Sequence, residues 1–211
     1  MLFQSKAYFP TMQISNALVN DQVLITRLKK GERTAFKELV ESLQDQVFNT
    51  AIGFVHNEKD AEDVAQEVFI EVYNSINDFQ EDSALTTWVY RIAINKSLNL
   101  LRYKKRKKRS WFFQALFNSD DDVDQLQQDR PFYHPGVDLE NKERSAMLFD
   151  AIGNLSEAQR VAFTLNKVEG LKYDEIAAIM ERSASSVQGL IHRAKEQLKK
   201  ELYEAYTSGS I

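Results

Sequence analysis

Apolar residues recur three and four positions apart along most of this chain, and only 7 Gly and 3 Pro interrupt its 211 residues. That spacing places apolar side chains on one face of an α-helix, whereas a half-buried strand requires alternation at every second residue. Gly and Pro are the residues that most often end helices, so their scarcity favours long helices. The hydrophobic content of 43% is enough to bury a core in each of one or two small domains. We therefore predict an all-α protein.

The residue composition excludes several classes of site. The chain has no Cys, which removes disulfides, thiolate zinc sites and cysteine nucleophiles and fits a reducing compartment. Its three His, at positions 56, 134 and 192, are too scattered to indicate a metal site. No window reaches the roughly 18 apolar residues of a transmembrane helix, and residues 1–20 lack the features of a secretory signal. We expect a cytoplasmic protein with no cofactor, no metal and no direct membrane insertion. Its residues 1–20 should form a loosely ordered tail, in which Met12 is a second candidate start.

The first half of the chain predicts four helices in a compact domain over residues 21–109. The first helix, over 23–30, should end at Gly31, and the second keeps helical period over 36–55. Asp60 is the candidate N-cap of the third helix. The inner face of that helix should carry Val64, Val68, Val72 and Tyr73. Its outer face is a strongly acidic strip made of Glu62, Asp63, Gln66, Glu67 and Glu71.

The fourth segment, 86–109, carries localised positive charge. From Arg91 to Arg109 there are nine Lys or Arg and no Asp or Glu, although the formal net charge of the chain is −4. One face is an apolar stripe of Tyr90, Ile94, Leu98 and Leu101, and another carries Trp88, Arg91, Asn95, Asn99 and Arg102. An aromatic plane, amides and cations together can stack on unpaired bases and hold phosphates. For Trp88 itself, core packing and base contact stay equally open.

Residues 110–143 predict a flexible linker, because they mix aromatic residues, an acidic run and prolines without a sustained period. The trio Asp120, Asp121 and Asp122 lies there and offers the only candidate carboxylates for a metal-dependent nuclease. Since clustered acids in an irregular polar stretch are usually solvated, we do not expect an enzyme.

The second domain is predicted over 144–211. Ser156 and Gln159 form a capping-box pattern at the start of a helix whose inner residues are Val161, Ala162 and Leu165, and which should end at Gly170. A short helix over 173–180, a turn over 181–183 and a longer helix from Ala184 follow. Val187, Ile191, Ala194 and Leu198 should form the buried stripe of that last helix. This is the pattern of a DNA-reading helix-turn-helix, although a plain helical hairpin fits it as well.

Together the two halves resemble the bacterial RNA polymerase sigma factors of the extracytoplasmic-function type. The resemblance rests on four segments in order, namely DAEDVAQEVFIEVY (60–73), TTWVYRIAINKSLNLLR (86–102), LSEAQRVAF (155–163) and EGLKYDEIAAIMERSASSVQGLIHRAKEQL (169–198). It implies a transcription initiation factor with a region 2 domain, a linker and a region 4 helix-turn-helix domain. It also implies core RNA polymerase and promoter DNA as partners, and no small-molecule substrate.

The resemblance assigns a role to each surface. The acidic helix would dock on the clamp coiled coil of the largest polymerase subunit through Asp63, Gln66 and Glu67. The basic helix would melt the minus-10 element and hold its non-template strand, using Trp88, Arg91, Asn95, Lys96, Arg102, Lys104, Lys105 and Arg106. The helix-turn-helix would read the minus-35 duplex in the major groove, through Ser185, Ser186, Gln188, His192, Arg193 and Lys195. In the family the linker runs through the polymerase cleft toward the RNA exit path, where acidic side chains can mimic an RNA backbone. The acidic run Asp120–Asp124 would suit that role.

This chain departs from the family pattern at two places. Val89 follows Trp88 where housekeeping sigma factors carry a second Trp, and Gln188, Gly189 and Leu190 replace a run that usually holds two cations. We therefore expect weaker phosphate contact at the minus-35 duplex and a shallower salt dependence of that binding. Without an extra domain before residue 20, we expect control by a separate anti-sigma factor. The rival interpretation is a two-domain DNA-binding regulator that does not act as a polymerase subunit, and it would leave the acidic strip without a purpose.

Overall fold

The described part of the chain is helical, as predicted. The computed structural model describes residues 18–117 and 139–207, with side chains placed over 21–107, 147–203 and at Thr207. Within these ranges there is no strand, and a single 3₁₀ turn, η2 (Ile76–Asp78), joins two of the helices. The helices are α1 (Leu18–Lys29), α2 (Arg33–Val55), α3 (Glu58–Ser75), α4 (Leu85–Phe117), α5 (Leu139–Asn154), α6 (Glu157–Lys167), α7 (Tyr173–Met180) and α8 (Ala184–Thr207). The predicted tail and the Asp120–Asp124 run lie outside these ranges.

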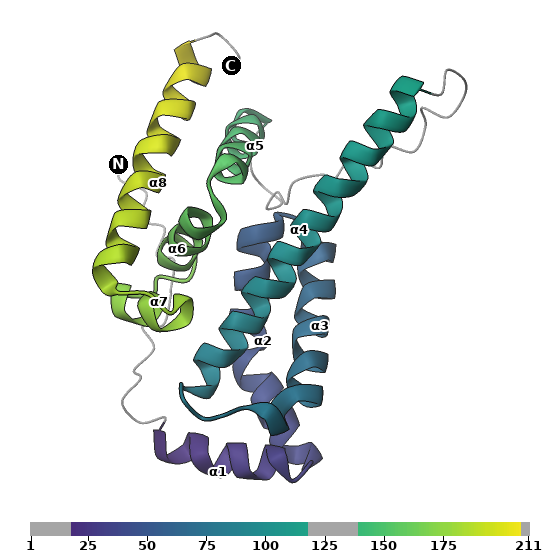
Figure 1. Cartoon of the computed structure of the whole chain (residues 1–211), viewed down its shortest axis with the longest axis vertical. Helices are drawn as coiled ribbons and strands as arrows, with labels where there is room; N and C mark the ends of the chain where they lie inside the picture. The colour runs from purple at the N-terminus through teal and green to yellow at the C-terminus, as the bar shows by residue number, and fades with distance from the viewer. Residues whose placement is uncertain (1–17, 118–138, 208–211) are drawn as a thin grey trace.

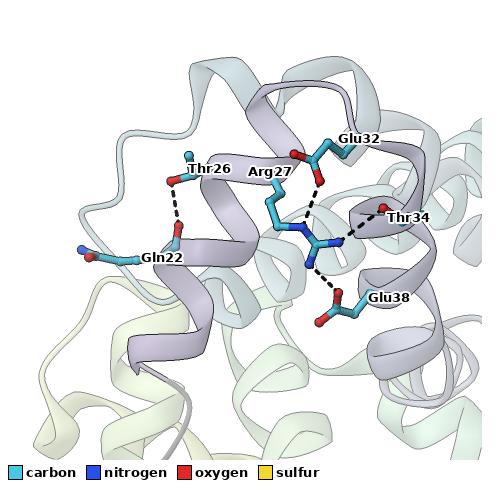
Figure 2. Close-up of polar contacts among 6 residues, drawn as sticks. All are labelled: Gln22, Thr26, Arg27, Glu32, Thr34 and Glu38. Atoms are coloured by element: carbon cyan, nitrogen blue, oxygen red, sulfur yellow. Dashed lines mark hydrogen bonds and ion pairs between the residues drawn. The ribbon is translucent and has the colours of Figure 1, made fainter.

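A tight turn and one arginine fix α1 against α2. Gly31 has a φ of 76°, a left-handed conformation that glycine adopts without strain, and it ends the first helix as predicted. Arg27 then reaches across the turn and donates to Glu32, Thr34 and Glu38, at 3.0, 3.3 and 2.8 Å (Figure 2). As a result, α1 lies across one end of the bundle that α2, α3 and α4 form (Figure 1).

The junction between α2 and α3 corrects the predicted N-cap. His56 takes a left-handed conformation, with φ 54°, and ends α2. The next residue, Asn57, is the true cap, because its side-chain oxygen accepts from the backbone N–H of Asp60 at 3.0 Å. Asp60 therefore lies inside the first turn rather than before it, and its carboxylate pairs with Lys104 at 2.6 Å. Both Asn and Asp cap well, so the sequence pattern was one turn out of register.

The N-terminal half has its own core among α1, α2, α3 and α4, centred on residues such as Leu39, Val68 and Val89. The predicted inner face of α3 is correct for Val64, Val68 and Val72, which are all buried. It is wrong for Tyr73, which is 56% exposed and meets the Phe36 ring edge to face, at a centroid distance of 5.2 Å. Five residues after Val68, Tyr73 is about 140° further round the helix, so it falls at the margin of the core.

Helix α4 is longer than predicted. It continues without a break to Phe117, so the predicted linker loses its first eight residues, 110–117, to a helix. No Gly or Pro occurs between Leu85 and Phe117, and the basic run consists of good helix formers. Figure 1 shows the far end of α4 extending beyond the bundle. The linker also ends early, because α5 starts at Leu139.

The C-terminal half is formed by α5, α6, α7 and α8. The predicted capping box is present, since the backbone N–H of Gln159 donates to the Ser156 hydroxyl and the backbone N–H of Ser156 donates to the Gln159 side chain. Helix α6 ends at Lys167, and Gly170, with φ 68°, turns the chain three residues later than the helix end. The bounds of α7 and the start of α8 agree with the prediction, and the stripe of Val187, Ile191, Ala194 and Leu198 is buried.

Candidate nucleic-acid and polymerase interfaces

The outer face of α3 is exposed and acidic. Asp63, Gln66 and Glu67, the residues predicted to contact polymerase, all face solvent. Ile70 and Tyr73 continue the same face and are 61% and 56% exposed. The predicted outer face did not include Ile70, although it lies four positions after Gln66, and Tyr73 was wrongly predicted to lie on the inner face. The surface therefore combines carboxylates with exposed apolar groups, which suits a partner that presents basic and apolar side chains together.

Trp88 contributes to the core of the N-terminal half. Its ring lies 5.0 Å from that of Phe79, between centroids, with the planes tilted by 32°. It is partly buried against the core, whereas Asn95 and Asn99, about two and three turns further along, are exposed. In this arrangement Trp88 offers at most part of its surface to a base, and the exposed amides are the more accessible hydrogen-bonding groups on this face of α4.

Arg91 reaches the C-terminal half. Its guanidinium donates to the backbone carbonyls of Ala178 and Ile179, at 2.8 and 3.2 Å, and pairs with Glu181 at 3.0 Å. These acceptors lie at the end of α7, where the last carbonyls of a helix have no partner within the helix and attract positive charge. Arg91 therefore satisfies the C-terminus of α7.

A second arginine makes a similar contact. Arg102 donates through Nε and Nη2 to the two carboxylate oxygens of Glu157, in the first turn of α6. This two-point geometry is the strongest form of an arginine–carboxylate pair. Its hydrogen bonds lower the pKa of the Glu157 carboxyl below the usual value. Both side chains are about half exposed, at 54% and 50%, so salt will screen the pair.

The other cations of the predicted minus-10 surface divide into two groups. Lys96 pairs with Glu71 at 3.3 Å and with Glu67 at 3.9 Å, and Lys104 pairs with Asp60. These two cations serve to hold α4 against α3. Lys105 and Arg106 are exposed, and within the described residues they form no ion pair. The cations available to an outside polyanion therefore gather toward the extended end of α4.

The apolar stripe of α4 is buried by the other half of the protein. Tyr90, Ile94 and Leu98 share one cluster with Phe54 of α2 and with residues of the C-terminal half, namely Val161, Ala162, Leu165, Ile176, Ile179, Val187, Leu190 and Ile191. The periodicity of α4 predicted that this stripe would be buried, but it did not reveal what covers it. Figure 1 shows α6 and α7 beside α2 and α4.

Polar groups are also buried where the halves meet. Burial raises the pKa of Glu169 to about 7, against the smaller opposing effect of the nearby Thr50 and Tyr90 hydroxyls. Burial and the nearby Arg160 lower the pKa of His56 to about 4, and its ring stacks on that of Phe149 at a centroid distance of 4.2 Å. Desolvation likewise raises the pKa of Tyr90. This boundary is therefore well packed but carries ionisable groups that water would stabilise better.

The last helix presents the predicted reading face to solvent. Exposed positions are Ser185, Gln188, His192, Arg193 and Lys195, and Ser186 is partly exposed. Ser183, absent from the predicted set, orders the start of α8, because its hydroxyl accepts from the backbone N–H of Ser186 at 3.2 Å. Leu190 is only 7% exposed and belongs to the buried cluster. A cation would not fit at that position in this arrangement, which gives a structural reason for the departure noted in the sequence.

The described residues show no arrangement suited to metal chemistry. Among them, no group of three or more His, Cys, Asp or Glu could hold a metal ion. Asp120, Asp121 and Asp122 lie outside the described residues. No helix in residues 18–117 and 139–207 is long and apolar enough to cross a bilayer.

Comparison with known proteins decides the family. Residues 39–107 match the family model of sigma-70 region 2, and residues 145–198 match that of sigma-70 region 4. The RNA polymerase sigma-H factor of Pseudomonas aeruginosa is 35% identical over 192 residues, which cover 86% of this chain and 93% of that protein. The ECF RNA polymerase sigma-E factor of Escherichia coli K12 is also 35% identical, over 85% of this chain and 93% of its own length. The chain belongs to the extracytoplasmic-function RNA polymerase sigma factors.

Solved structures of similar fold agree. CnrH, in complex with the cytosolic domain of CnrY, superimposes with a TM-score of 0.60 at 23% identity, over 87% of this sigma factor and 97% of that chain. The sigma factor RpoE from Bartonella quintana, in complex with the anti-sigma factor NepR, gives a TM-score of 0.54 at 21% identity, over 80% and 96% of the two chains. Region 2 of this sigma factor, residues 39–107, thus comprises most of α2, all of α3 and the part of α4 up to Lys107. Region 4, residues 145–198, comprises most of α5, all of α6 and α7, and α8 up to Leu198.

Proposed function

We propose that this sigma factor recruits core RNA polymerase through the outer face of α3 and recognises promoters with α4 and α8. In this scheme α4 melts and holds the minus-10 non-template strand, and α8 reads the minus-35 duplex. The observation that carries the proposal is the exposed face of α8. Gln188, His192 and Arg193 are exposed on the second helix of a helix-turn-helix, and among the described residues His192 and Arg193 form no ion pair.

The chemistry of α8 favours contact with base edges over contact with many phosphates. Gln can pair with adenine through two hydrogen bonds, and Arg can do so with guanine. The face holds few cations, and Leu190 is buried. Minus-35 binding should therefore depend on salt less steeply than binding through a strongly basic helix, because each phosphate contact contributes about 0.9 to the log–log slope.

The exposed cations and amides of α4 support strand capture. Lys105 and Arg106 can attract the DNA backbone, and Asn95 can donate to and accept from an unpaired base. Base stacking on an aromatic ring contributes about 1–3 kcal/mol, so any stacking on Trp88 would offset part of the cost of unstacking the duplex. Arg91, Lys96, Arg102 and Lys104 form ion pairs within the protein, and they could contribute to DNA binding only by exchanging those partners.

The outer face of α3 provides a direct test of polymerase docking. Replacing Asp63 and Glu67 together by Arg brings the formal charge of the strip from −4 to 0 without touching the buried face of α3. The wild type should retain core RNA polymerase in a pull-down and the double variant should not. A control with Glu41→Arg on the exposed side of α2 should behave as the wild type. Equal retention of polymerase by all three proteins would reject α3 as the docking surface. Specific DNA binding without polymerase would favour the rival regulator.

We further propose that a separate anti-sigma protein controls this factor. The support is that RpoE of Bartonella quintana, which shares the fold, was solved in complex with the anti-sigma factor NepR. Co-purification of a tagged copy from its native cells should retain a partner that lowers transcription when added back. Activity that no retained protein lowers would speak against such control.

A further inference from the structure

We propose that Lys29, in the last turn of α1, is a positioning residue for Trp88, because it holds the loop that connects η2 to α4. This inference rests on the proposed function, in which the exposed part of Trp88 faces the unpaired DNA strand. Lys29 precedes the segment that matches region 2, residues 39–107. The role proposed for α4 therefore depends on a helix that lies before region 2 in the chain.

Lys29 holds the loop with two hydrogen bonds from one ammonium group, which we call the Lys29 bridge. Its Nζ donates to the backbone carbonyl of Phe79 at 3.0 Å and to the Glu81 carboxylate at 2.6 Å. Helix α1 is itself fixed, because Leu28 is buried in the core and Arg27 binds two carboxylates beyond the turn. Figure 1 shows α1 across the end of the bundle at which α4 begins. The ammonium group thus reaches the loop from a firmly packed helix.

The backbone of Glu81 needs such a contact because it is strained. Its φ is 61°, a left-handed conformation that residues with a Cβ adopt only at a cost. Strain of this kind persists only where surrounding contacts hold it. Residues 80–83 make no backbone-to-backbone hydrogen bond with the rest of the described chain, and the buried Ser83 Oγ has no partner there either. The Lys29 bridge therefore supplies the polar contacts that keep this turn in place.

The loop acts on Trp88 through one aromatic contact. Phe79, whose backbone carbonyl accepts the first bond of the bridge, is 3% exposed. Its ring lies 5.0 Å from that of Trp88, between centroids, and Trp88 is partly buried against the same core. A shift of the backbone at Phe79 would move the ring against which Trp88 packs. Lys29 thus positions this tryptophan without touching it.

The Lys29 bridge is too exposed to serve mainly as a source of global stability. The side chains of Lys29 and Glu81 are 30% and 41% exposed, and salt screens ion pairs at that exposure. Such pairs contribute little to the free energy of unfolding. Replacing Glu81 by Gly removes the ion pair and the backbone strain together. This variant should therefore unfold at the same urea concentration as the wild type or a higher one, although its loop is less well held.

The position of Trp88 can be followed without DNA. The chain has two Trp, so Trp111→Phe leaves Trp88 as the only one. In that background, Lys29→Met and Glu81→Gly should increase the quenching of Trp88 fluorescence by acrylamide and shift its emission to longer wavelength. Lys29→Arg, which can still pair with Glu81, should match the parent. Urea unfolding of each variant checks that a change in quenching does not come from loss of the fold.

Binding of single-stranded DNA of mixed sequence separates positioning from charge. Glu81→Gly removes a negative charge, which by electrostatics alone would tighten binding to a polyanion. Positioning by the bridge predicts the opposite, about fivefold weaker binding, which is the lower end of what one stacked base contributes. Asp78→Asn is the matched control, because it removes one charge from an exposed site just before the loop. It should bind as tightly as the wild type or slightly more tightly.

Two results would overturn the proposal. Unchanged quenching of Trp88 in both Lys29→Met and Glu81→Gly would show that the bridge does not position the ring. Binding of DNA by Glu81→Gly that is as tight as that of the wild type, or tighter, would show that the bridge does not serve the DNA contact. Trp88→Leu tests the proposed function separately. Equal DNA binding by this variant and the wild type would reject the contact of Trp88 with DNA, while the quenching result still decides whether Lys29 positions the ring.

Discussion

Replacing Glu169 by Gln should stabilise this sigma factor at neutral and alkaline pH. The substitution keeps the shape of the side chain and removes its charge. Burial raises the pKa of the Glu169 carboxyl from 4.5 to about 7 in the folded protein. Each pKa unit corresponds to about 1.4 kcal/mol, so burying the ionised form costs about 3 kcal/mol above pH 7.

The sign of the pH dependence follows from proton binding. Because the pKa of Glu169 is raised, the folded state binds more protons than the unfolded chain between pH 4.5 and 7. The destabilising contribution of Glu169 is therefore absent below about pH 4.5, grows between the two pKa values and is complete above about pH 7. His56 acts oppositely, since its lowered pKa makes the fold lose stability as pH falls from 6.5 toward 4. His56 is present in both proteins, so its contribution cancels when the free energy of unfolding of the wild type is subtracted from that of Glu169→Gln at the same pH.

Urea unfolding followed by circular dichroism measures that difference. At pH 8, Glu169→Gln should exceed the wild type in free energy of unfolding by about 2–3 kcal/mol, and at pH 5 by less than about 1 kcal/mol. Glu41→Gln, on the exposed side of α2, serves as the matched control and should leave stability nearly unchanged at both pH values. A difference that is the same at pH 5 and pH 8, or a variant that is less stable at pH 8, would refute this reasoning.

Three further predictions concern local contacts. Ser156→Ala removes the capping box of α6 and should lower the free energy of unfolding by about 1 kcal/mol in urea, whereas an unchanged midpoint would show that α6 does not depend on its cap. Leu165 is 0% exposed in the cluster that the two halves share, so Leu165→Ala should leave a cavity and lower the free energy of unfolding by about 3 kcal/mol in the same assay. A loss below about 1 kcal/mol would contradict close packing between the halves. Gln188→Arg should steepen the salt dependence of duplex DNA binding by the full chain by about 0.9 in log–log slope, and an unchanged slope would place this face of α8 away from the phosphates.

Local signals in the sequence were sufficient for most of the helices. The capping box at Ser156 and Gln159 and the glycine at position 31 act over a few residues, so the pattern alone locates them. The same holds for the short helix of the helix-turn-helix, whose bounds were predicted correctly. The cap of α3 was missed because Asn57 and Asp60 are both suitable residues, and only the position of the chain reversal at His56 decides between them.

Contacts between the halves could not be predicted in this way. Periodicity shows that Tyr90, Ile94 and Leu98 are buried, but the covering residues come from region 4, about 70 to 100 positions later in the chain. Arg91 and Arg102 carry the same charge whether they face DNA or a carbonyl, so their partners depend on tertiary structure. The predicted roles of these residues in promoter binding therefore stay predictions, now with a specific competing contact.

Run-off transcription from a pool of genomic promoters tests the central claim most directly. Core RNA polymerase would be combined with the wild type, with the Asp63→Arg, Glu67→Arg double variant, or with the Glu41→Arg control. The wild type and the control should produce transcripts from a small set of specific starts, and the double variant should produce none above core polymerase alone. Absence of any specific start with the wild type, or the same starts with the double variant, would contradict promoter recognition through polymerase docked on α3.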